Sequence, residues 1–184
     1  MTRIKLLDIS EAPQEVRPIL ENAQKNNGFL PNLLRVLANA PAALETYVTV
    51  SGINAKASFS LNEREVVQIT AAALHGCGFC VAGHTAIALK KAQLPKEVVE
   101  ALRNIHDLDD PKLNAVARFT QNVIATRGNV KDEDLASFKA VGYNDQAALE
   151  VVLGVSLATL CNFANNLGQP PINEQLLPYE WKKQ

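Results

Sequence analysis

Reactive side chains are concentrated in residues 60–92 of this sequence, which hold two of its three cysteines and two of its three histidines. Cys77 and Cys80 form a C-x-x-C, and His84 follows Cys80 by four residues. Glu65 precedes Cys77 by twelve residues. A thiol, an imidazole and a carboxylate are the parts of an activated nucleophile, in which a base deprotonates the thiol and a third group orients the base.

Two helices must bring these side chains together. Ser60 and Glu63 form a capping-box pattern, which predicts that an apolar helix begins there. Gly76 and Gly78 flank Cys77 and predict a helix end followed by a tight restart. Cys77 would then lie at the N-terminus of the second helix, where the helix dipole and unpaired N–H groups favour a thiolate.

The second helix places Cys80 and His84 on one face, at i and i+4, so the imidazole can reach the thiol. Glu65 on the first helix can orient or charge that imidazole. The helix dipole favours a thiolate at Cys77, whereas the histidine favours one at Cys80. A full charge relay usually outweighs a partial dipole, so we predict that Cys80 attacks and that Cys77 is the more exposed resolving thiol.

Three interpretations of the cluster compete: a redox dithiol, a metal site, and small residues buried in a helix pair. C-x-x-C-x-x-x-H is plausible ligand spacing, but neither Cys161 nor His75 is an evident fourth ligand for zinc. Free cysteine is often a small core residue, and the βαβ context that normally accompanies a redox C-x-x-C is missing. The in-phase His84 and the upstream Glu65 favour the redox dithiol, with no metal or other cofactor.

The spacing E-x11-C-x-x-C-x-x-x-H in a helical setting resembles the alkylhydroperoxidase D (AhpD) family, within the carboxymuconolactone decarboxylase-like superfamily. The resemblance is sharpest from about residue 61 to residue 92 and continues more weakly through residues 114–127 and 149–168. Residues 1–60 look like the N-terminal extension of peroxidase-related members. The resemblance implies an AhpD-like all-α fold, and a core over residues 61–168 followed by a tail over residues 169–184.

The implied activity is reduction of alkyl hydroperoxides through the dithiol, with Cys80, Cys77, His84 and Glu65 as catalytic residues. The resemblance further implies a lipoyl- or thioredoxin-type reductant and a homo-oligomer, a trimer or hexamer. One position departs from the family pattern: AhpD itself carries a histidine next to the second cysteine, and this chain has Phe79. That departure weakens the expectation of full peroxidase turnover, although not of dithiol chemistry.

Two other functions compete with the peroxidase. A non-redox decarboxylase of the same superfamily would not need paired cysteines. A redox-sensing helical oligomer would use the disulfide for regulation rather than for turnover. Near the C-terminus, Asn162 and Asn165 either cap a helix that ends before Gly168, its C′ residue, or line the active pocket, and Cys161 is expected to be a buried, inert thiol.

Length and composition fit one soluble domain. The chain has 184 residues, 47% of them hydrophobic, and a net charge of −1, so nothing indicates nucleic acid or an anionic membrane as a partner. No apolar run approaches the length of a transmembrane helix, and the first ten residues do not resemble a signal peptide. Three cysteines, two of them in a C-x-x-C, fit a reducing compartment, so we expect a cytoplasmic protein.

Apolar periodicity and Gly/Pro punctuation predict a single all-α domain of eight or nine helices. The last and longest helix is apolar around nearly its whole circumference, which indicates a central core helix or one shared with another subunit. Besides the pair in residues 61–93, helices are expected over residues 12–26, 32–39, 41–56, 95–105, 112–127, 131–141 and 146–167.

Overall fold

The computed structural model describes residues 2–182, and these contain nine α-helices, two short 3₁₀ helices and no strand. The predicted all-α, AhpD-like helical fold is confirmed. The elements are η1 Gln14–Val16, α1 Arg17–Asn27, α2 Asn32–Leu37, α3 Pro41–Asn54, α4 Leu61–Leu74, α5 Gly78–Lys90, α6 Lys96–Arg103, α7 Pro111–Thr126, α8 Asp132–Ala140, α9 Asp145–Gly168 and η2 Glu174–Tyr179.

Each predicted helix is present, and most ends differ from the prediction by only a few residues. The first predicted helix is divided, because η1 precedes α1 and proline stands at the start of α1. The prediction that α9 ends before Gly168 is wrong. Gly168 is the last residue of the helix, and Gln169 takes the left-handed conformation with φ 48°. Residues 183–184 of the predicted tail, and residue 1 of the predicted extension, lie outside the described residues.

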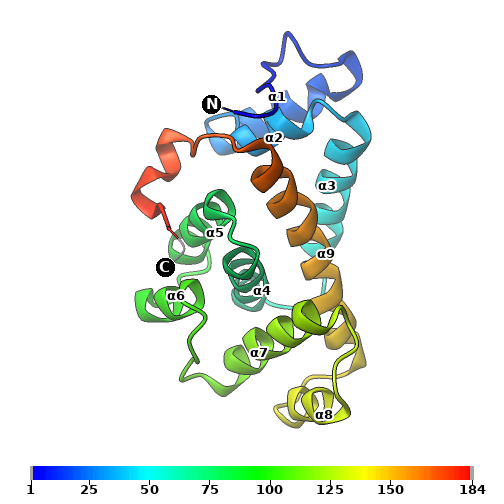
Figure 1. The fold of residues 1–184 in the computed structure, drawn as a ribbon, viewed down its shortest axis with the longest axis vertical. Helices are drawn as coiled ribbons and strands as arrows, with labels where there is room; N and C mark the ends of the chain where they lie inside the picture. Colours follow the sequence, from blue (N-terminus) through cyan, green and yellow to red (C-terminus); the bar gives the residue numbers. More distant parts are fainter. Residues whose placement is uncertain (1, 183–184) are drawn as a thin grey trace.

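Helix α4 lies at the centre of the fold and packs against α5, α6, α7 and α9 (Figure 1). Figure 1 shows α1 and α2 at one end of the long helix α9 and α8 at the other end. Helix α9 comes very close to α4 at Gly154, where an added Cβ would stand 2.8 Å from Cγ1 of Val67. The amide Nε2 of Gln68 donates to the carbonyl of Gly154 at 2.9 Å, so the two helices are joined in register.

Two hydrophobic clusters fill the interior, and α4 contributes to both. The first, here called the aromatic core, contains two stacked ring pairs, Phe119 with Phe138 and Phe138 with Tyr143. The second, here called the thiol core, holds all three cysteines. The buried members of the aromatic core are Phe59, Val66, Val67, Ile69, Ala88, Leu94, Val99, Leu102, Leu108, Val116, Ala117, Phe119, Val123, Phe138, Ala147 and Val151. The buried members of the thiol core are Ala12, Val16, Leu20, Leu33, Leu34, Leu37, Ala38, Leu44, Ala72, Ala73, Cys77, Cys80, Val81 and Cys161.

Helix α9 is only partly covered by the rest of the chain. Among the described residues it is the one helix long and apolar enough to cross a membrane, and 39% of its most apolar window is buried. One face packs on α2, α3, α4 and α7. The other face leaves large apolar side chains exposed, Leu149, Val152, Phe163 and Leu167. An apolar face of this size on a helix that also carries part of the core indicates a further contact surface.

Candidate active site

A three-residue turn joins α4 to α5 and positions both cysteines of the C-x-x-C. Gly76 has φ 69°, and its N–H donates to the carbonyl of Ala73, while the N–H of Cys77 donates to that of Ala72. These two bonds form a Schellman motif, which ends a helix through a residue in the left-handed region. The predicted helix end and restart around Cys77 are therefore present. At the other end of α4, the capping box of Ser60 and Glu63 is also formed.

Cys77 is the N-cap residue of α5. Its sulfur accepts a hydrogen bond from the backbone N–H of Cys80 at 3.3 Å, which satisfies one of the free donors at the helix start. The pKa of Cys77 is lowered, first because the Cys80 thiol hydrogen-bonds to its sulfur and also because of this backbone bond. Burial opposes the shift but does not cancel it. Cys77 therefore holds the more acidic thiol of the pair.

Cys80 lies on α5 and faces α9. It is 5% exposed and Cys77 is 1% exposed, so the prediction that Cys77 is the more exposed thiol is wrong. Burial raises its pKa well above the ordinary value, and hydrogen bonds with the thiols of Cys161 and Cys77 add to the effect. The amide Nδ2 of Asn165, on α9, donates to the sulfur of Cys80 at 3.1 Å. The thiol of Cys80 is thus held by three side chains, two of them on a helix more than eighty residues later in the chain.

Glu65 and His84 form a close pair between α4 and α5. Oε2 of Glu65 lies 2.8 Å from Nδ1 of His84, and 6% of the glutamate side chain and 23% of the histidine side chain are exposed. Burial lowers the pKa of His84, but the charge and the hydrogen bond of Glu65 raise it by more. The pKa of His84 is therefore raised above its ordinary value of 6.5. An imidazole so placed is a proton-holding group at neutral pH.

The structure does not join His84 to Cys80 as the i, i+4 spacing suggested. Within residues 2–182, the hydrogen bond of His84 is to Glu65, and the sulfur of Cys80 is bonded by Asn165 instead. Electrostatic coupling nevertheless links His84 to the thiol core, since the charges of Cys161 and Cys77 also raise the pKa of His84.

A pocket of about 290 Å³ opens beside the thiol pair. Of the residues predicted to form the site, Cys77, Phe79 and Asn165 line it, together with the end of α9 and the segment that follows. Cys80 does not line it, and neither does Asn162. The Asn162 amide contacts Nδ1 of His75 at 3.1 Å instead, so the two predicted asparagines have different surroundings. Neither asparagine caps α9, since both side chains are buried against α4 and α5.

Asn165 has one further property that suits a binding site. Its oxygen Oδ1 is buried and has no hydrogen-bond partner among the described residues, while its nitrogen holds Cys80. A buried amide oxygen without a partner costs free energy. A substrate O–H in the adjoining pocket is a donor of the kind that this oxygen lacks.

Two residues of the thiol core were not predicted to belong to the site. The thiol of Cys161, on α9, donates to the carbonyl of Leu157 at 3.2 Å, and the neighbouring Cys80 is the first cause of its lowered pKa. Tyr47, on α3, packs against the same core, and its pKa is raised by burial and by the charges of Cys161 and Cys80. Local spacing could not reveal either residue, because both approach the cysteines from other helices.

Metal binding finds no support in the arrangement of these side chains. Among residues 2–182 no group of three or more His, Cys, Asp and Glu side chains is placed to hold a metal ion. The expectation that the protein uses no metal remains a prediction. The three cysteines belong to the thiol core, and Nδ1 of His84 lies 2.8 Å from Oε2 of Glu65.

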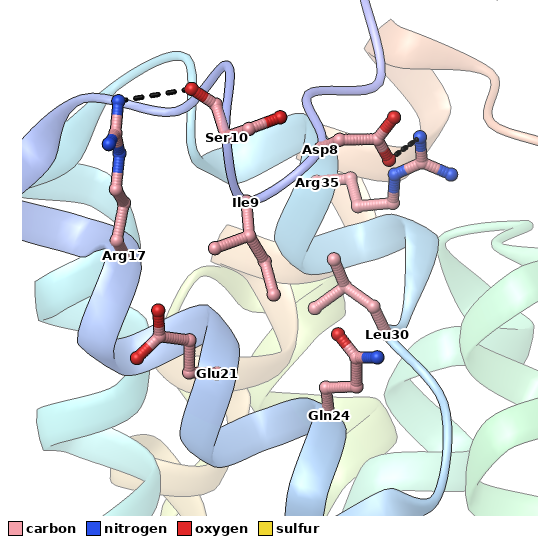
Figure 2. A pocket seen from close by; sticks show the side chains of 8 residues that line it. All are labelled: Asp8, Ile9, Ser10, Arg17, Glu21, Gln24, Leu30 and Arg35. Atoms are coloured by element: carbon pink, nitrogen blue, oxygen red, sulfur yellow. Dashed lines mark hydrogen bonds and ion pairs between the residues drawn. The ribbon is translucent and has the colours of Figure 1, made fainter.

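A larger depression, of about 640 Å³, lies far from this chemistry, between the N-terminal segment, α1 and α2 (Figure 2). It contains no cysteine or histidine among its lining residues. Its two guanidinium groups already have partners: Arg17 donates to the carbonyl of Ser10, and Arg35 pairs with Asp8 at 2.6 Å. Size alone therefore does not make this depression the better candidate site.

Comparison with known proteins shows what this chain is similar to. The profile of the carboxymuconolactone decarboxylase family matches residues 41–122, which include α4, α5 and the site between them. The fold is that of the AhpD core over nearly the whole chain. The chain is thus similar to AhpD-like proteins of the carboxymuconolactone decarboxylase superfamily. Proteins of curated function include no significant sequence match.

Several solved structures share this AhpD-like fold. An AhpD-core, peroxidase-related protein from Ralstonia eutropha JMP134 has a TM-score of 0.86 and 21% identity, with 95% of this chain and 94% of that chain covered. A peroxidase-related protein from Silicibacter sp. TM1040 has a TM-score of 0.78 and 18% identity, with both chains covered completely. The debrominase Bmp8 has a TM-score of 0.79 and 19% identity, with 97% and 96% covered. The fold therefore supports more than one reaction.

Proposed function

We propose that this AhpD-like protein is a thiol-dependent peroxidase that reduces alkyl hydroperoxides through Cys77 and Cys80. The observation that carries the proposal is the C-x-x-C itself: one thiol is acidic and lines a pocket, and the other lies behind it in direct contact. That arrangement supplies an attacking thiolate and a resolving thiol within one helical turn.

The contacts in the thiol core favour Cys77, not Cys80, as the attacking thiol. Cys77 lines the pocket and its pKa is lowered, whereas burial first raises the pKa of Cys80. The sequence-based assignment rested on a relay from His84 to Cys80, but the imidazole hydrogen-bonds to Glu65, and Asn165 holds Cys80. We therefore reverse the assignment: Cys77 attacks and Cys80 resolves.

The reaction then has two chemical steps and a reset. The Cys77 thiolate attacks the distal oxygen of the hydroperoxide, the O–O bond breaks, and the alkoxide leaves with a proton to give the alcohol. His84, whose pKa the carboxylate of Glu65 raises, is the group that would supply this proton. The thiol of Cys80 condenses with the Cys77 sulfenic acid, which releases water and forms the disulfide.

An external dithiol restores the thiols by exchange at the sulfur of Cys77, which faces the pocket. A lipoyl- or thioredoxin-type reductant fits this step, since each presents a dithiol that can close its own disulfide. No metal, haem or flavin takes part. Phe79 stands on the same pocket wall as Cys77, so the position that holds a histidine in AhpD contributes apolar surface for the alkyl group here.

A second candidate follows from the fold relative that is a debrominase. Thiol attack on a halogen and thiol attack on a peroxide oxygen both need a reactive thiolate beside an apolar pocket, and the same disulfide would result. A non-redox decarboxylase is a weaker candidate, because it gives the paired thiols no role. A redox sensor would share the disulfide but would not turn over.

Consumption of an alkyl hydroperoxide, with dihydrolipoamide supplied in excess, tests the proposal. Wild type is compared with Cys77→Ser and Cys80→Ser, and Ser137→Ala, an exposed hydroxyl on α8, is the matched control. We expect many turnovers for wild type and the control, and none for either cysteine variant. A single stoichiometric oxidation without turnover would support a redox sensor instead of an enzyme. Full turnover in Cys77→Ser would exclude the mechanism in which Cys77 attacks the hydroperoxide.

The partners and location of the protein are part of the same proposal. We infer a cytoplasmic homo-oligomer, a trimer or a hexamer, that does not bind nucleic acid or membrane. The exposed apolar face of α9 supports a second copy of the chain as its partner, because α9 carries no lysine or arginine along its 24 residues. Sedimentation of wild type beside Leu149→Lys, which places a charge on that face, tests this, and an unchanged mass in the variant would exclude α9 as the interface.

A further inference from the structure

Cys77 is the thiol that must meet both the hydroperoxide and the reductant, yet it is 1% exposed. A hydroperoxide is small enough for the pocket of about 290 Å³ that Cys77 lines, whereas the dithiol of a lipoyl- or thioredoxin-type reductant is carried on a protein. Thiol–disulfide exchange needs direct attack of the incoming thiolate on a sulfur, so its rate depends on access. The segments that cover Cys77 therefore decide which reactant can approach it.

The chain after α9 is one of these covering segments. Residues 169–173 and 174–182 are here called the first and second parts of the C-terminal strap. Figure 1 shows the strap leaving the end of α9 and reaching α5 and α6. Its first two residues line the pocket beside Cys77, and Trp181 packs against the thiol core. An added Cβ on Gly78 would stand 3.0 Å from the carbonyl oxygen of Trp181, so the strap passes directly against the residue that follows Cys77.

The first part of the strap is fixed to the start of α2 and the residues before it. The backbone N–H of Asn32 donates to Oδ1 of Asn173 at 2.9 Å, and the side-chain amide of Asn32 donates to the carbonyl of Pro171 at 3.0 Å. The amide of Asn173 donates in turn to the carbonyl of Leu30 at 3.2 Å. Three partly buried hydrogen bonds therefore hold the strap up to Asn173.

The second part of the strap is held by weaker contacts. Helix η2 within it buries no residue. Nη2 of Arg103 donates to the carbonyl of Glu180 at 2.9 Å in an exposed position, and Nζ of Lys90 lies 5.2 Å from the ring centroid of Tyr179. Trp181 is half-buried. A segment with few buried apolar contacts and with exposed hydrogen bonds opens at a low cost in free energy, so the second part can leave while the first part stays.

We propose that the second part of the C-terminal strap is a cover over Cys77, which opens to admit the protein-borne dithiol. A small hydroperoxide reaches the sulfur through the pocket while the cover is closed. The proposal rests on the proposed function, because the thiolate and the disulfide at Cys77 are the groups that the cover shields. The hinge lies at Asn173, where the firmly held part of the strap ends.

With the cover open, the exchange balances with the dithiol as the one added reactant. One thiol of the reductant loses its proton and attacks the sulfur of Cys77, the bond between Cys77 and Cys80 breaks, and its electron pair goes to Cys80, which takes up a proton. The second thiol of the reductant loses its proton to the solvent, attacks the mixed disulfide and releases Cys77 as a thiolate. The reductant is oxidised to its own disulfide, and both cysteines of the protein are reduced.

Two full-length variants loosen the cover without replacing a cysteine. Arg103→Leu removes the donor to the strap carbonyl at residue 180. Arg103 also pairs with Glu100 at 3.0 Å, so Glu100→Gln, which loses that ion pair and keeps the contact with the strap, is the matched control. Gly78→Ala presses a methyl group against the strap backbone. Gly83→Ala, on the same helix with nothing within 4 Å of the added Cβ, is its control.

Alkylation of Cys77 in the reduced protein measures how often the cover is open. A small reagent, iodoacetamide, is compared with a maleimide attached to polyethylene glycol, and Cys77 is followed by mass spectrometry. The ratio of the bulky rate to the small rate removes any change in the reactivity of the thiol itself. We expect this ratio to rise by about two- to tenfold in Arg103→Leu, the effect of one lost hydrogen bond. Gly78→Ala should raise it too, and neither control should.

The fluorescence of Trp181 gives a second readout, because it is the one tryptophan in the sequence. Opening of the cover moves this side chain from the thiol core into water. In Arg103→Leu and Gly78→Ala, its emission should shift to longer wavelength and acrylamide should quench it more strongly. Glu100→Gln and Gly83→Ala should match wild type. Circular dichroism checks that each variant keeps its helices.

The outcomes separate the cover from the peroxidase. If the rate ratio and the fluorescence are the same in wild type and in Arg103→Leu and Gly78→Ala, the cover is wrong, whether or not hydroperoxide is consumed. If both variants open but hydroperoxide oxidises no cysteine in wild type, the cover is correct and the peroxidase is wrong. Where both hold, reduction of the disulfide by reduced thioredoxin should be faster in Arg103→Leu, while oxidation by hydroperoxide keeps the wild-type rate. Equal acceleration of the two steps would overturn the separate entry of the two reactants.

Discussion

The two cores of this protein share α4 but differ in what fills them. The aromatic core contains two stacked ring pairs with centroids 4.4 and 4.6 Å apart, and its buried residues are large and apolar. The buried members of the thiol core are aliphatic residues and the three cysteines, and the amide of Asn165 donates to the sulfur of Cys80. The first core is built for packing, while the second has polar groups held in place by long-range contacts.

This difference shows that packing in the aromatic core stabilises the fold, whereas the polar groups buried at the thiol core cost free energy. Stacked aromatic side chains bury large apolar areas and add ring–ring attraction. Beside the thiol core, the fold instead buries a carboxylate and an amide oxygen that has no partner among the described residues, and it half-buries an imidazole. Such groups are expensive to bury, and their concentration beside Cys77, which lines the smaller pocket, is a mark of function rather than of packing.

Breaking the aromatic core should produce the largest effect on stability. Phe138 is 2% exposed and stacks on both Phe119 and Tyr143. We expect Phe138→Ala to lower the free energy of unfolding by about 3–5 kcal/mol, because it removes a buried ring and leaves a cavity. Urea unfolding measures this. The thiol core should be unaffected below the transition, so unchanged alkylation rates of Cys77 at low temperature would separate the two cores, and altered rates would show that they are coupled.

The two thiols of the C-x-x-C should titrate in opposite directions. Iodoacetamide alkylation against pH, with each cysteine followed by mass spectrometry, should show Cys77 reacting at lower pH than an ordinary cysteine. Cys80 should react only at higher pH, since burial raises its pKa. His84→Ala should slow Cys77 at neutral pH through loss of a positive charge. A Cys80 that reacts first, and slows in His84→Ala, would restore the relay that the sequence suggested.

The sequence predicts the local parts of this site well and the long-range parts poorly. Ser60 with Glu63, and Gly76, are helix signals within one turn, so the ends of α4 and the position of Cys77 follow from them. The contacts that hold Cys80 come from Asn165 and Cys161, some eighty residues away, and no local spacing encodes how α9 lies on α5. The prediction from the shared helix face that His84 contacts Cys80 is wrong, whereas the predicted contact of Glu65 with His84 is present at 2.8 Å.

Within the thiol core, Glu65→Gln should change how stability depends on pH. The folded-state pKa of His84 is raised above 6.5 by Glu65, so the pair stabilises the fold fully below the unfolded value of about 6.5 and loses this effect as pH rises through the folded value. The stability difference between wild type and Glu65→Gln should therefore be larger at pH 6 than at pH 9. Urea unfolding at both pH values measures it, and NMR of the His84 ring should show a lower pKa in the variant. An equal difference at both pH values would mean that the pair is not charged.

The smallest effect should come from Asn165→Ala, which removes one hydrogen bond from the Cys80 sulfur. A single hydrogen bond contributes about 0.5–1.5 kcal/mol, so we expect a change of a few fold in the alkylation rate of Cys80. Asn165 is 4% exposed, and its Oδ1 is buried without a hydrogen-bond partner among residues 2–182. Asn165→Ala also removes this unpartnered oxygen, which offsets part of the stability lost with the hydrogen bond to Cys80. Asn165→Asp is the informative companion, because it keeps the shape and presents a charge to the thiols.

If the Asn165 amide also binds substrate, Asn165→Ala should raise KM for hydroperoxide more than it lowers kcat. A purely structural contact would lower the free energy of unfolding and leave KM unchanged. This difference between an effect on KM and an effect on stability matters for the comparison of the two cores. A residue of the aromatic core should change only the free energy of unfolding. The free-energy cost of burying Oδ1 of Asn165 without a partner would then be offset when a substrate O–H in the pocket donates to it.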